Sequence, residues 1–281
     1  MRIGIAGLGK MGTNHLNELR KDSEFELVAL YDLYLNEKVN EPFFTNLDEF
    51  LKTKLDIAII SSPTSTHLEL AKAILPKVKT CLIEKPLALN LEQMNEINRL
   101  AKEYGNFVAV GFSERFNPAI LALKKELENE KILSINIQRY SPFPSRISDV
   151  GILQDLSVHD VDLVSFLSQM QCKRQGILSI KKEGREIEAI ISLQNNALIA
   201  SVHQSWNAAL KIRRVSVITQ NSFFEANLND FTLHKNGSLL DLQGESPLYA
   251  EHKELLNLAK SGKMGRLATI EDAINAQLCL E

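Results

Sequence analysis

The chain has 281 residues, of which 44% are hydrophobic, and its 32 basic and 35 acidic side chains give a formal net charge of -3. This balance excludes the strongly basic field that attracts nucleic acid, so we expect a small-molecule ligand. The length predicts two domains, and no apolar run approaches the roughly 20 residues that cross a membrane. The chain begins directly with a strand pattern rather than a signal peptide, which predicts a cytoplasmic protein.

The first 32 residues carry the pattern of a dinucleotide-binding turn. An apolar strand at residues 3–6 enters Gly7-Leu8-Gly9-Lys10-Met11-Gly12, a helical pattern follows, and a strand at residues 27–31 ends at Asp32. Gly7 permits a tight turn, Gly9 lets the main chain approach a pyrophosphate, and Gly12 lets the helix pack on the strand. The helix N-terminus offers N–H groups to the phosphates. Because Asp32 suits ribose hydroxyls and would repel a 2′-phosphate, we predict NAD as the cofactor.

Strands and helices continue to alternate up to residue 111. We expect strands at residues 56–60, 80–83 and 107–111, and helices at 47–51, 67–75 and 90–104, the last capped by Asn90 and closed by Gly105. This order predicts an α/β Rossmann fold, a doubly wound parallel sheet whose ligand crevice lies at the carboxyl ends of the strands. The candidate cofactor-binding residues there are Gly7, Leu8, Gly9, Lys10, Met11, Gly12, Asp32, Ser62, Pro63, Thr64, His67, Glu84 and Lys85. We expect His15 only to pack on the first helix.

The pattern changes near Pro118. A helix at residues 119–130 precedes strand patterns at residues 133–140, 176–181, 186–193, 198–206 and 214–219, and a last helix covers residues 270–280. These alternating segments predict an α+β domain with a largely antiparallel open sheet, whose free face is available to substrate or to a partner subunit. We therefore divide the chain into an NAD-binding domain, residues 1–118, and a substrate-binding and oligomerisation domain, residues 119–281.

Asp155 and His159 are four residues apart in a helical pattern, so we expect them to share one helix face. A carboxylate beside an imidazole orients the ring and stabilises it after it accepts a proton, as the oxidation of an alcohol requires. The alternatives are that His159 is a core histidine and that Asp155, Asp160 and Asp162 form a solvated face or bind a metal. No second cluster of ligands completes a metal shell, so we predict no metal. Cys81, Cys172 and Cys279 are expected to be reduced packing thiols.

Several of these motifs together resemble one family. The glycine loop, residues 60–63 followed by His67, the tripeptide Glu84-Lys85-Pro86 and the helix of Asp155 and His159 resemble the glucose-fructose oxidoreductase, inositol dehydrogenase and rhizopine-catabolism (Gfo/Idh/MocA) oxidoreductases. The resemblance implies that Lys85 hydrogen-bonds the reacting hydroxyl beside the nicotinamide, that His159 is the general base and that Asp155 supports the proton transfer. It also implies a homodimer or homotetramer that forms through the open sheet.

A narrower resemblance concerns the substrate. Residues 114–118 and 139–151 are similar to those of bacterial UDP-N-acetylglucosamine 3-dehydrogenases, which oxidise the sugar 3-hydroxyl on a route to the 2,3-diamino sugars of lipid A. It implies substrate-binding roles for Arg115, Asn117, Arg139 and Arg146. Arg139 and Arg146 are the candidate diphosphate partners, because a guanidinium group matches phosphate oxygens. The alternatives are that Arg115 and Asn117 only hold the domain junction and that Arg146 forms a surface ion pair. Two other functions stay open: a dehydrogenase of another sugar or inositol, and a non-catalytic dinucleotide-sensing protein.

Overall fold

The computed structural model describes residues 1–34, 39–144 and 151–281, and for Gln154 and Asp155 it describes the main chain alone. The described residues form two compact units. The first contains Met1–Ser113 and Leu248–Ile274, and the second contains Glu114–Pro247 and Asn275–Glu281. This division differs from the predicted single boundary at residue 118, because a late segment of the chain returns to the first unit.

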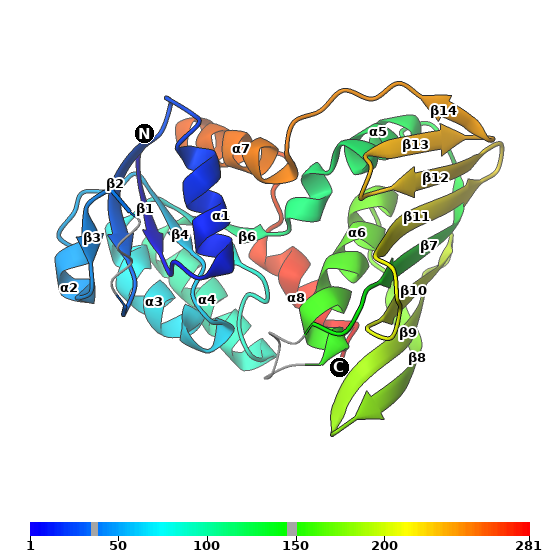
Figure 1. Ribbon diagram of the computed structural model, residues 1–281, viewed down its shortest axis with the longest axis horizontal. Helices are drawn as coiled ribbons and strands as arrows, with labels where there is room; N and C mark the ends of the chain where they lie inside the picture. Colours follow the sequence, from blue (N-terminus) through cyan, green and yellow to red (C-terminus); the bar gives the residue numbers. More distant parts are fainter. Residues whose placement is uncertain (35–38, 145–150) are drawn as a thin grey trace. The chain divides into compact units, whose positions relative to one another are not determined.

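The first unit is built on a parallel sheet with the strand order β3-β2-β1-β4-β5-β6 (Figure 1). All neighbouring pairs are parallel, which confirms the predicted doubly wound Rossmann sheet. The purely apolar β4 is buried at every position, as a strand covered on both faces should be. The strands are β1 Arg2–Ala6, β2 Glu26–Tyr31, β3 Phe43–Phe44, β4 Ile57–Ile60, β5 Thr80–Glu84 and β6 Phe107–Gly111.

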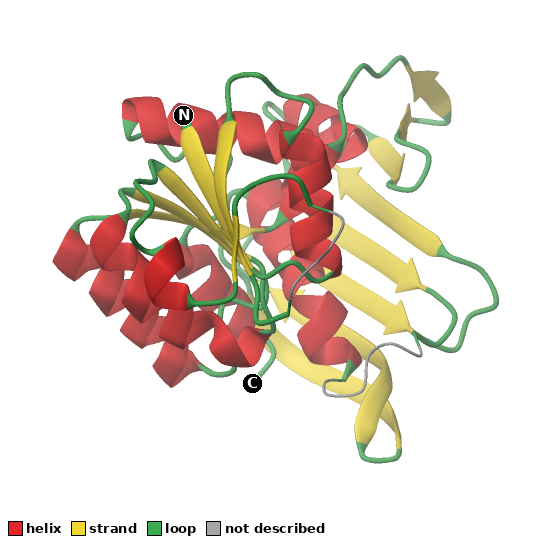
Figure 2. Cartoon of the chain, turned by 60° about the vertical axis from the view of Figure 1, so that its left-hand side comes forward, coloured by secondary structure: helices red, strands yellow, loops and turns green. Residues whose placement is uncertain are grey.

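Helices cover both faces of this sheet (Figure 2). They are α1 Lys10–Leu19, α2 Leu47–Phe50, α3 His67–Ile74, α4 Leu91–Tyr104, α7 Pro247–Ser261 and the greater part of α8 Ile270–Leu278. Helix α4 begins and ends as predicted: the side chain of Asn90 accepts a hydrogen bond from the main-chain N–H of Gln93 at 2.9 Å, and Gly105 closes the helix in the left-handed conformation. Helix α7 was not predicted, and it lies beside α1 in Figure 1, where their side chains are hydrogen-bonded.

The second unit is built on a sheet with the strand order β14-β13-β12-β11-β7-β10-β9-β8. Strand β10 pairs with β7 in parallel and the other neighbouring pairs are antiparallel, so the predicted largely antiparallel sheet is confirmed. The strands are β7 Ile132–Tyr140, β8 Lys173–Lys182, β9 Arg185–Gln194, β10 Ile199–Ser205, β11 Ile212–Thr219, β12 Phe223–Asn227, β13 Thr232–Lys235 and β14 Ser238–Leu240.

Helices α5 Pro118–Glu126 and α6 Val158–Ser168 contact this sheet, α5 on β12 and β13 and α6 on β7 and β10. Alternate strand residues such as Ile135, Ile137 and Val202 are fully or almost fully buried, and these positions form the core. The predicted helix at residues 119–130 ends early, at Glu126, and the side chain of Glu130 accepts a hydrogen bond from the hydroxyl of Thr219 at 2.9 Å.

Strands β12, β13 and β14 were not predicted. No helix among the described residues is long and apolar enough to span a membrane.

Candidate functional site

The three glycines of the first loop have different surroundings, which can be tested by asking what a Cβ atom would meet. A Cβ on Gly7 would lie 2.3 Å from the main-chain nitrogen of Ser62, and Gly7 has a φ of 99°. A Cβ on Gly12 would lie 1.9 Å from the carbonyl oxygen of Gly7. A Cβ on Gly9, in contrast, would meet no atom within 4 Å. Neighbouring main-chain atoms therefore leave no room for a side chain at Gly7 and Gly12, whereas Gly9 is open and a phosphate group has room to approach there.

The N-terminus of α1 continues this open side. Gly9 is the N-cap, and none of the described side chains caps it, so the first N–H groups of the helix are available to an anion. At the end of β2, the carboxylate of Asp32 accepts hydrogen bonds from the main-chain N–H groups of Leu8 at 2.7 Å and Tyr34 at 3.3 Å. Asp32 thus lies directly beside the loop that we predict to hold the pyrophosphate. Together these features fit the phosphate and ribose groups of a dinucleotide.

The loop that follows β4 is held against the glycine turn. The hydroxyl of Ser61 donates to the carbonyl oxygen of Gly7 at 2.8 Å. The ring nitrogens of the buried His67 lie 2.9 Å from the carbonyl oxygen of Ser62 and 3.2 Å from that of Leu87. Burial lowers the pKa of His67. His67 therefore ties together the loops after β4 and β5, and its predicted contact with the cofactor stays a prediction.

Lys85 follows the last residue of β5 and is half-buried. Its main-chain N–H donates to Oε2 of Glu84 at 3.2 Å, and Oε1 of Glu84 lies 2.9 Å from Nε2 of His15. Glu84 is only 5% exposed. The structure thus gives Glu84 buried protein partners, and its predicted contact with the cofactor stays untested.

In the second unit, His159 lies in the first turn of α6 and is half-buried. The preceding residues Leu153–Ser157 form a π-helical turn rather than the α-helix that the spacing predicted. In a π-helix the hydrogen-bonded partner is five residues away, so a separation of four does not define the same face. The side chain of Asp155 lies outside the described part of the structure, and its pairing with His159 stays a prediction.

A buried network of charged groups anchors α6 on both sides of His159. The guanidinium of Arg139 donates to both carboxylate oxygens of Asp160, with the shortest contact at 2.6 Å, and to Oε1 of Glu114 at 3.0 Å. Ser157 and Asp160 are also hydrogen-bonded to the amide of Gln204 on β10. Burial alone would lower the pKa of Arg139, but Asp160 and Glu114 outweigh burial and raise it.

Arg139 is only 3% exposed, and Asp160 is fully buried. The alternative that Asp160 belongs to a solvated face is therefore wrong, because the arginine neutralises it inside the unit. The same burial gives Arg139 a structural partner in place of an open phosphate site. The network, which includes Glu114 and Gln204, was not predicted.

Arg115 and Asn117 are likewise buried in the second unit. Nε and Nη2 of Arg115 donate to the two carboxylate oxygens of Asp162 at 2.7 and 2.5 Å. Asn117 caps α5 through the main-chain N–H of Ala119 and donates to the carbonyl oxygen of Leu228. These contacts favour the alternative that both residues hold the fold rather than the substrate. They also exclude a solvated position for Asp162.

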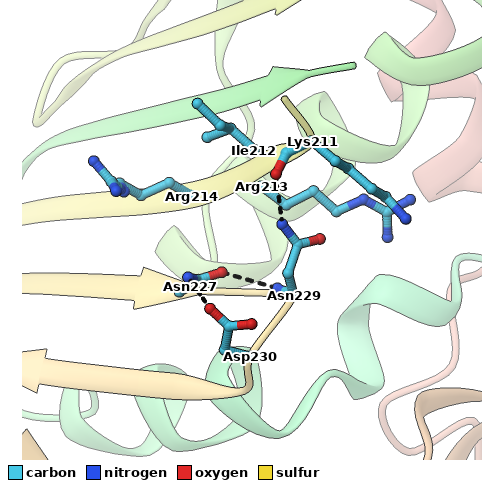
Figure 3. Close-up of a pocket in the computed structure, with 7 residues that line it drawn as sticks. All are labelled: Lys211, Ile212, Arg213, Arg214, Asn227, Asn229 and Asp230. Atoms are coloured by element: carbon cyan, nitrogen blue, oxygen red, sulfur yellow. Dashed lines mark hydrogen bonds between the residues drawn. The ribbon is translucent and has the colours of Figure 1, made fainter. Parts of the chain in front are cut away.

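A surface pocket lies between β11 and the turn after β12 (Figure 3). The side chains of Arg213 and Arg214 extend in opposite directions there, as successive residues of a strand do. Because the two guanidinium groups do not converge, we assign no ligand to this pocket. Arg146, the remaining predicted substrate residue, lies outside the described residues. The pocket is lined by Lys211, Ile212, Arg213, Arg214, Asn227, Asn229 and Asp230.

The three cysteines are buried and free. Burial raises the pKa of Cys81 to about 12 and also raises the pKa values of Cys172 and Cys279. Such thiols are poor nucleophiles, which agrees with the packing role expected for them. The described residues contain no group of three or more His, Cys, Asp or Glu side chains arranged to hold a metal ion.

Comparison with known proteins adds an independent line of evidence. Residues 1–112 match the model of an oxidoreductase family with an NAD-binding Rossmann fold, named GFO_IDH_MocA. The chain is 26% identical to the UDP-N-acetylglucosamine 3-dehydrogenase of Acidithiobacillus ferrooxidans over 98% of its own length and 88% of that protein. It is 29% identical to the myo-inositol 2-dehydrogenase of Thermotoga maritima, over 59% of this chain and 54% of that protein.

The fold comparison agrees with these matches. A solved structure of the Acidithiobacillus ferrooxidans enzyme superposes with a TM-score of 0.90 at 23% identity, covering 100% of this chain and 95% of that one. At this level of identity the superposition establishes the fold of both units.

Proposed function

We propose that this chain, which belongs to the Gfo/Idh/MocA family of NAD-dependent oxidoreductases that act on CH–OH groups, oxidises the 3-hydroxyl of UDP-N-acetylglucosamine to the 3-keto sugar. The single observation that supports this choice of substrate is the match to a UDP-N-acetylglucosamine 3-dehydrogenase along almost the whole chain, including the second unit. The inositol dehydrogenase match covers only 59% of the chain.

In the proposed reaction the C–H and O–H bonds of one secondary alcohol break and a carbonyl forms. Bound at the glycine loop, NAD supplies the acceptor of the hydride. His159 accepts the hydroxyl proton, Asp155 supports that transfer, and the ammonium of Lys85 holds the substrate oxygen by a hydrogen bond. Lys85 and His159 belong to different compact units, so their meeting at one substrate is part of the proposal.

The structure supports the cofactor part of this proposal most directly. The open side of Gly9, the uncapped N-terminus of α1 and the carboxylate of Asp32 lie together in the first unit. For the second unit, the support is that Ser157 and Asp160 are anchored to the sheet on either side of His159. Directional contacts on both sides of a residue define the position of its main chain, as a proton acceptor requires.

The test is an assay with UDP-N-acetylglucosamine as the substrate, in which the absorbance of NADH measures its formation. His159→Ala should lower kcat by at least about 100-fold, the range expected for a lost general base, while the affinity for NAD stays within about twofold. His234→Ala is the matched control, because His234 is a half-buried histidine of β13 outside the proposed site. Undiminished turnover of His159→Ala would remove His159 from the mechanism.

A second candidate is a dehydrogenase of another sugar or an inositol, which the similarity to a myo-inositol 2-dehydrogenase favours. The same assay with a panel of nucleotide sugars, sugar phosphates and free inositols separates it from the first. The non-catalytic alternative, a dinucleotide-sensing protein, predicts NAD binding without NADH formation on any of these compounds. The cytoplasmic location of the protein also stays a prediction.

We further propose that the outer face of the second sheet pairs with a second copy of the chain. In β9, β10 and β11 the residues of this face alternate with buried ones, and several residues of the sheet are large, apolar and exposed. Leu178 on β8 lies directly opposite Ile190 on β9, which makes the apolar surface continuous between these strands. A dimer or tetramer should therefore appear in the mass measured by light scattering. The exposed apolar residues are Leu178, Ile180, Ile190, Ile199 and Ile218.

A further inference from the structure

The first unit contains a buried polar cluster that the proposed reaction does not use. His15 of α1, Glu84 of β5 and His252 of α7 are 0%, 5% and 1% exposed. Nε2 of His15 lies 2.9 Å from Oε1 of Glu84, and Nδ1 of His15 lies 2.8 Å from Nε2 of His252. Three segments that are far apart in the sequence therefore meet through an unbroken row of hydrogen bonds, where α1 and α7 lie side by side (Figure 1).

One arrangement of protons gives each contact in this row a donor and an acceptor. When Nε2 of His15 donates to the carboxylate of Glu84, Nδ1 of His15 is left to accept a hydrogen bond from Nε2 of His252. His252 is then a neutral ring whose Nδ1 carries no proton, and this buried atom has no hydrogen-bond partner among the described residues. Burial and the neighbouring His15 hold the pKa of His252 well below its ordinary value, which agrees with a neutral ring.

The row ends at the main chain of Lys85. Oε2 of Glu84 accepts the N–H of Lys85 at 3.2 Å, while Oε1 accepts from His15. On its other side the carboxylate packs against Gly111 of β6, where a Cβ would lie 2.7 Å from Oε1. The carboxylate is therefore enclosed by His15, the main chain of Lys85 and Gly111.

We propose that His15, Glu84 and His252 form a positioning network that fixes Lys85, so that α7, a late segment of the chain, sets the place of the amine used in the reaction. Buried polar groups are costly unless each has a directional partner, and such contacts define geometry more strictly than apolar packing does. The inference rests on the proposed role of Lys85, and it assigns a positioning role to three residues to which the proposed reaction gives no chemical step.

The first measurement needs no substrate. Competitive acetylation of the cofactor-free protein over a range of pH values, read by mass spectrometry, gives the reactivity and apparent pKa of Lys85. His252→Leu removes the donor to His15, and His252→Gln retains a donor nitrogen at the place of Nε2. We expect a change of at least threefold in Lys85 reactivity for His252→Leu and recovery of most of it for His252→Gln. The control is Leu258→Ala, a fully buried apolar residue of the same helix.

Leu258→Ala should lower the stability of the protein without changing the reactivity of Lys85, because it removes packing of α7 but no member of the network.

The second measurement is the pH profile of kcat with any substrate that yields NADH. We expect His252→Leu to lower kcat at least tenfold with a shifted profile and little change in the KM for NAD, since small displacements of a reacting group have large kinetic effects. Glu84→Gln breaks the row at its other end and serves if His252→Leu does not fold.

The outcomes separate this inference from the proposed function. Equal Lys85 reactivity in His252→Leu and Leu258→Ala, or an unchanged kcat profile in His252→Leu, overturns the positioning network and leaves the function standing. A network-dependent Lys85 in a protein that forms no NADH on any substrate supports the network and overturns the proposed function.

Discussion

Two alanine substitutions in the glycine loop should affect different properties: Gly12→Ala should lower the stability of the fold, and Gly9→Ala should lower the affinity for NAD. In Gly12→Ala, the new Cβ would lie 1.9 Å from the carbonyl oxygen of Gly7, a main-chain atom that cannot rotate away. Overpacking of this kind costs about 1–3 kcal/mol of folding free energy or more. In Gly9→Ala, the new Cβ meets nothing within 4 Å, and the N-cap conformation is open to any residue. Only the loss of a favourable N-cap glycine remains, which is within about 1 kcal/mol.

For cofactor binding the expectation is different, because the open space at Gly9 is where we place the pyrophosphate. A methyl group there should weaken NAD binding at least tenfold, or about 1.4 kcal/mol. At an NAD concentration of about 100 times the wild-type Kd, ligand binding stabilises the native state by about 2.7 kcal/mol, and Gly9→Ala should halve this gain. Denaturant unfolding with and without NAD, together with calorimetric titration, measures both quantities. A Gly9→Ala protein with wild-type NAD affinity would refute the assignment of this loop.

Two further predictions concern the buried charges of the second unit. Arg115→Leu should destabilise the protein by about 3–5 kcal/mol because it leaves Asp162 buried without its guanidinium, whereas Arg115→Leu with Asp162→Leu should recover most of that loss; a double-mutant cycle in denaturant would show additivity if the ion pair did not matter. Burial opposes ionisation of Glu114, but Arg139 and Arg213 together hold its pKa below the ordinary value of 4.5. The stability from this lowered pKa is complete above pH 4.5 and is lost as the pH falls through the folded-state pKa, so Glu114→Gln should flatten the acid limb of the stability curve; an unchanged limb would contradict it.

The first unit could be predicted closely because its signals are local. Apolar runs of four or five residues, a capping asparagine and a closing glycine define β4 and α4 without knowledge of the rest of the chain. The return of α7 to this unit could not be predicted in the same way, because its helical pattern does not say which sheet it covers. The hairpin of β13 and β14 had a local signal that the prediction omitted: Asn236 and Gly237 both adopt positive φ in its turn, as this dipeptide often does.

For the candidate site, residues on loops were easier to predict than residues inside the unit. The glycine turn and Asp32 follow from strand ends and meet as expected. Arg139 was assigned to substrate by resemblance, although its register argued otherwise, since it continues the inward-facing row of Ile135 and Ile137. An ion pair between two elements, such as that of Arg139 and Asp160, cannot be predicted from the local sequence of either element.

The buried ion pairs bear on how α6 is placed. Asp160 and Asp162 are buried on a helix that is apolar around most of its circumference, so packing alone would permit several rotations against the sheet. Each rotation other than the observed one would separate Asp160 from Arg139 and leave the carboxylate buried without its guanidinium, a penalty of several kcal/mol. We infer that the arginines select one rotation of α6 rather than adding greatly to its stability. His159, which lies between the anchored Ser157 and Asp160, takes its main-chain position from that selection.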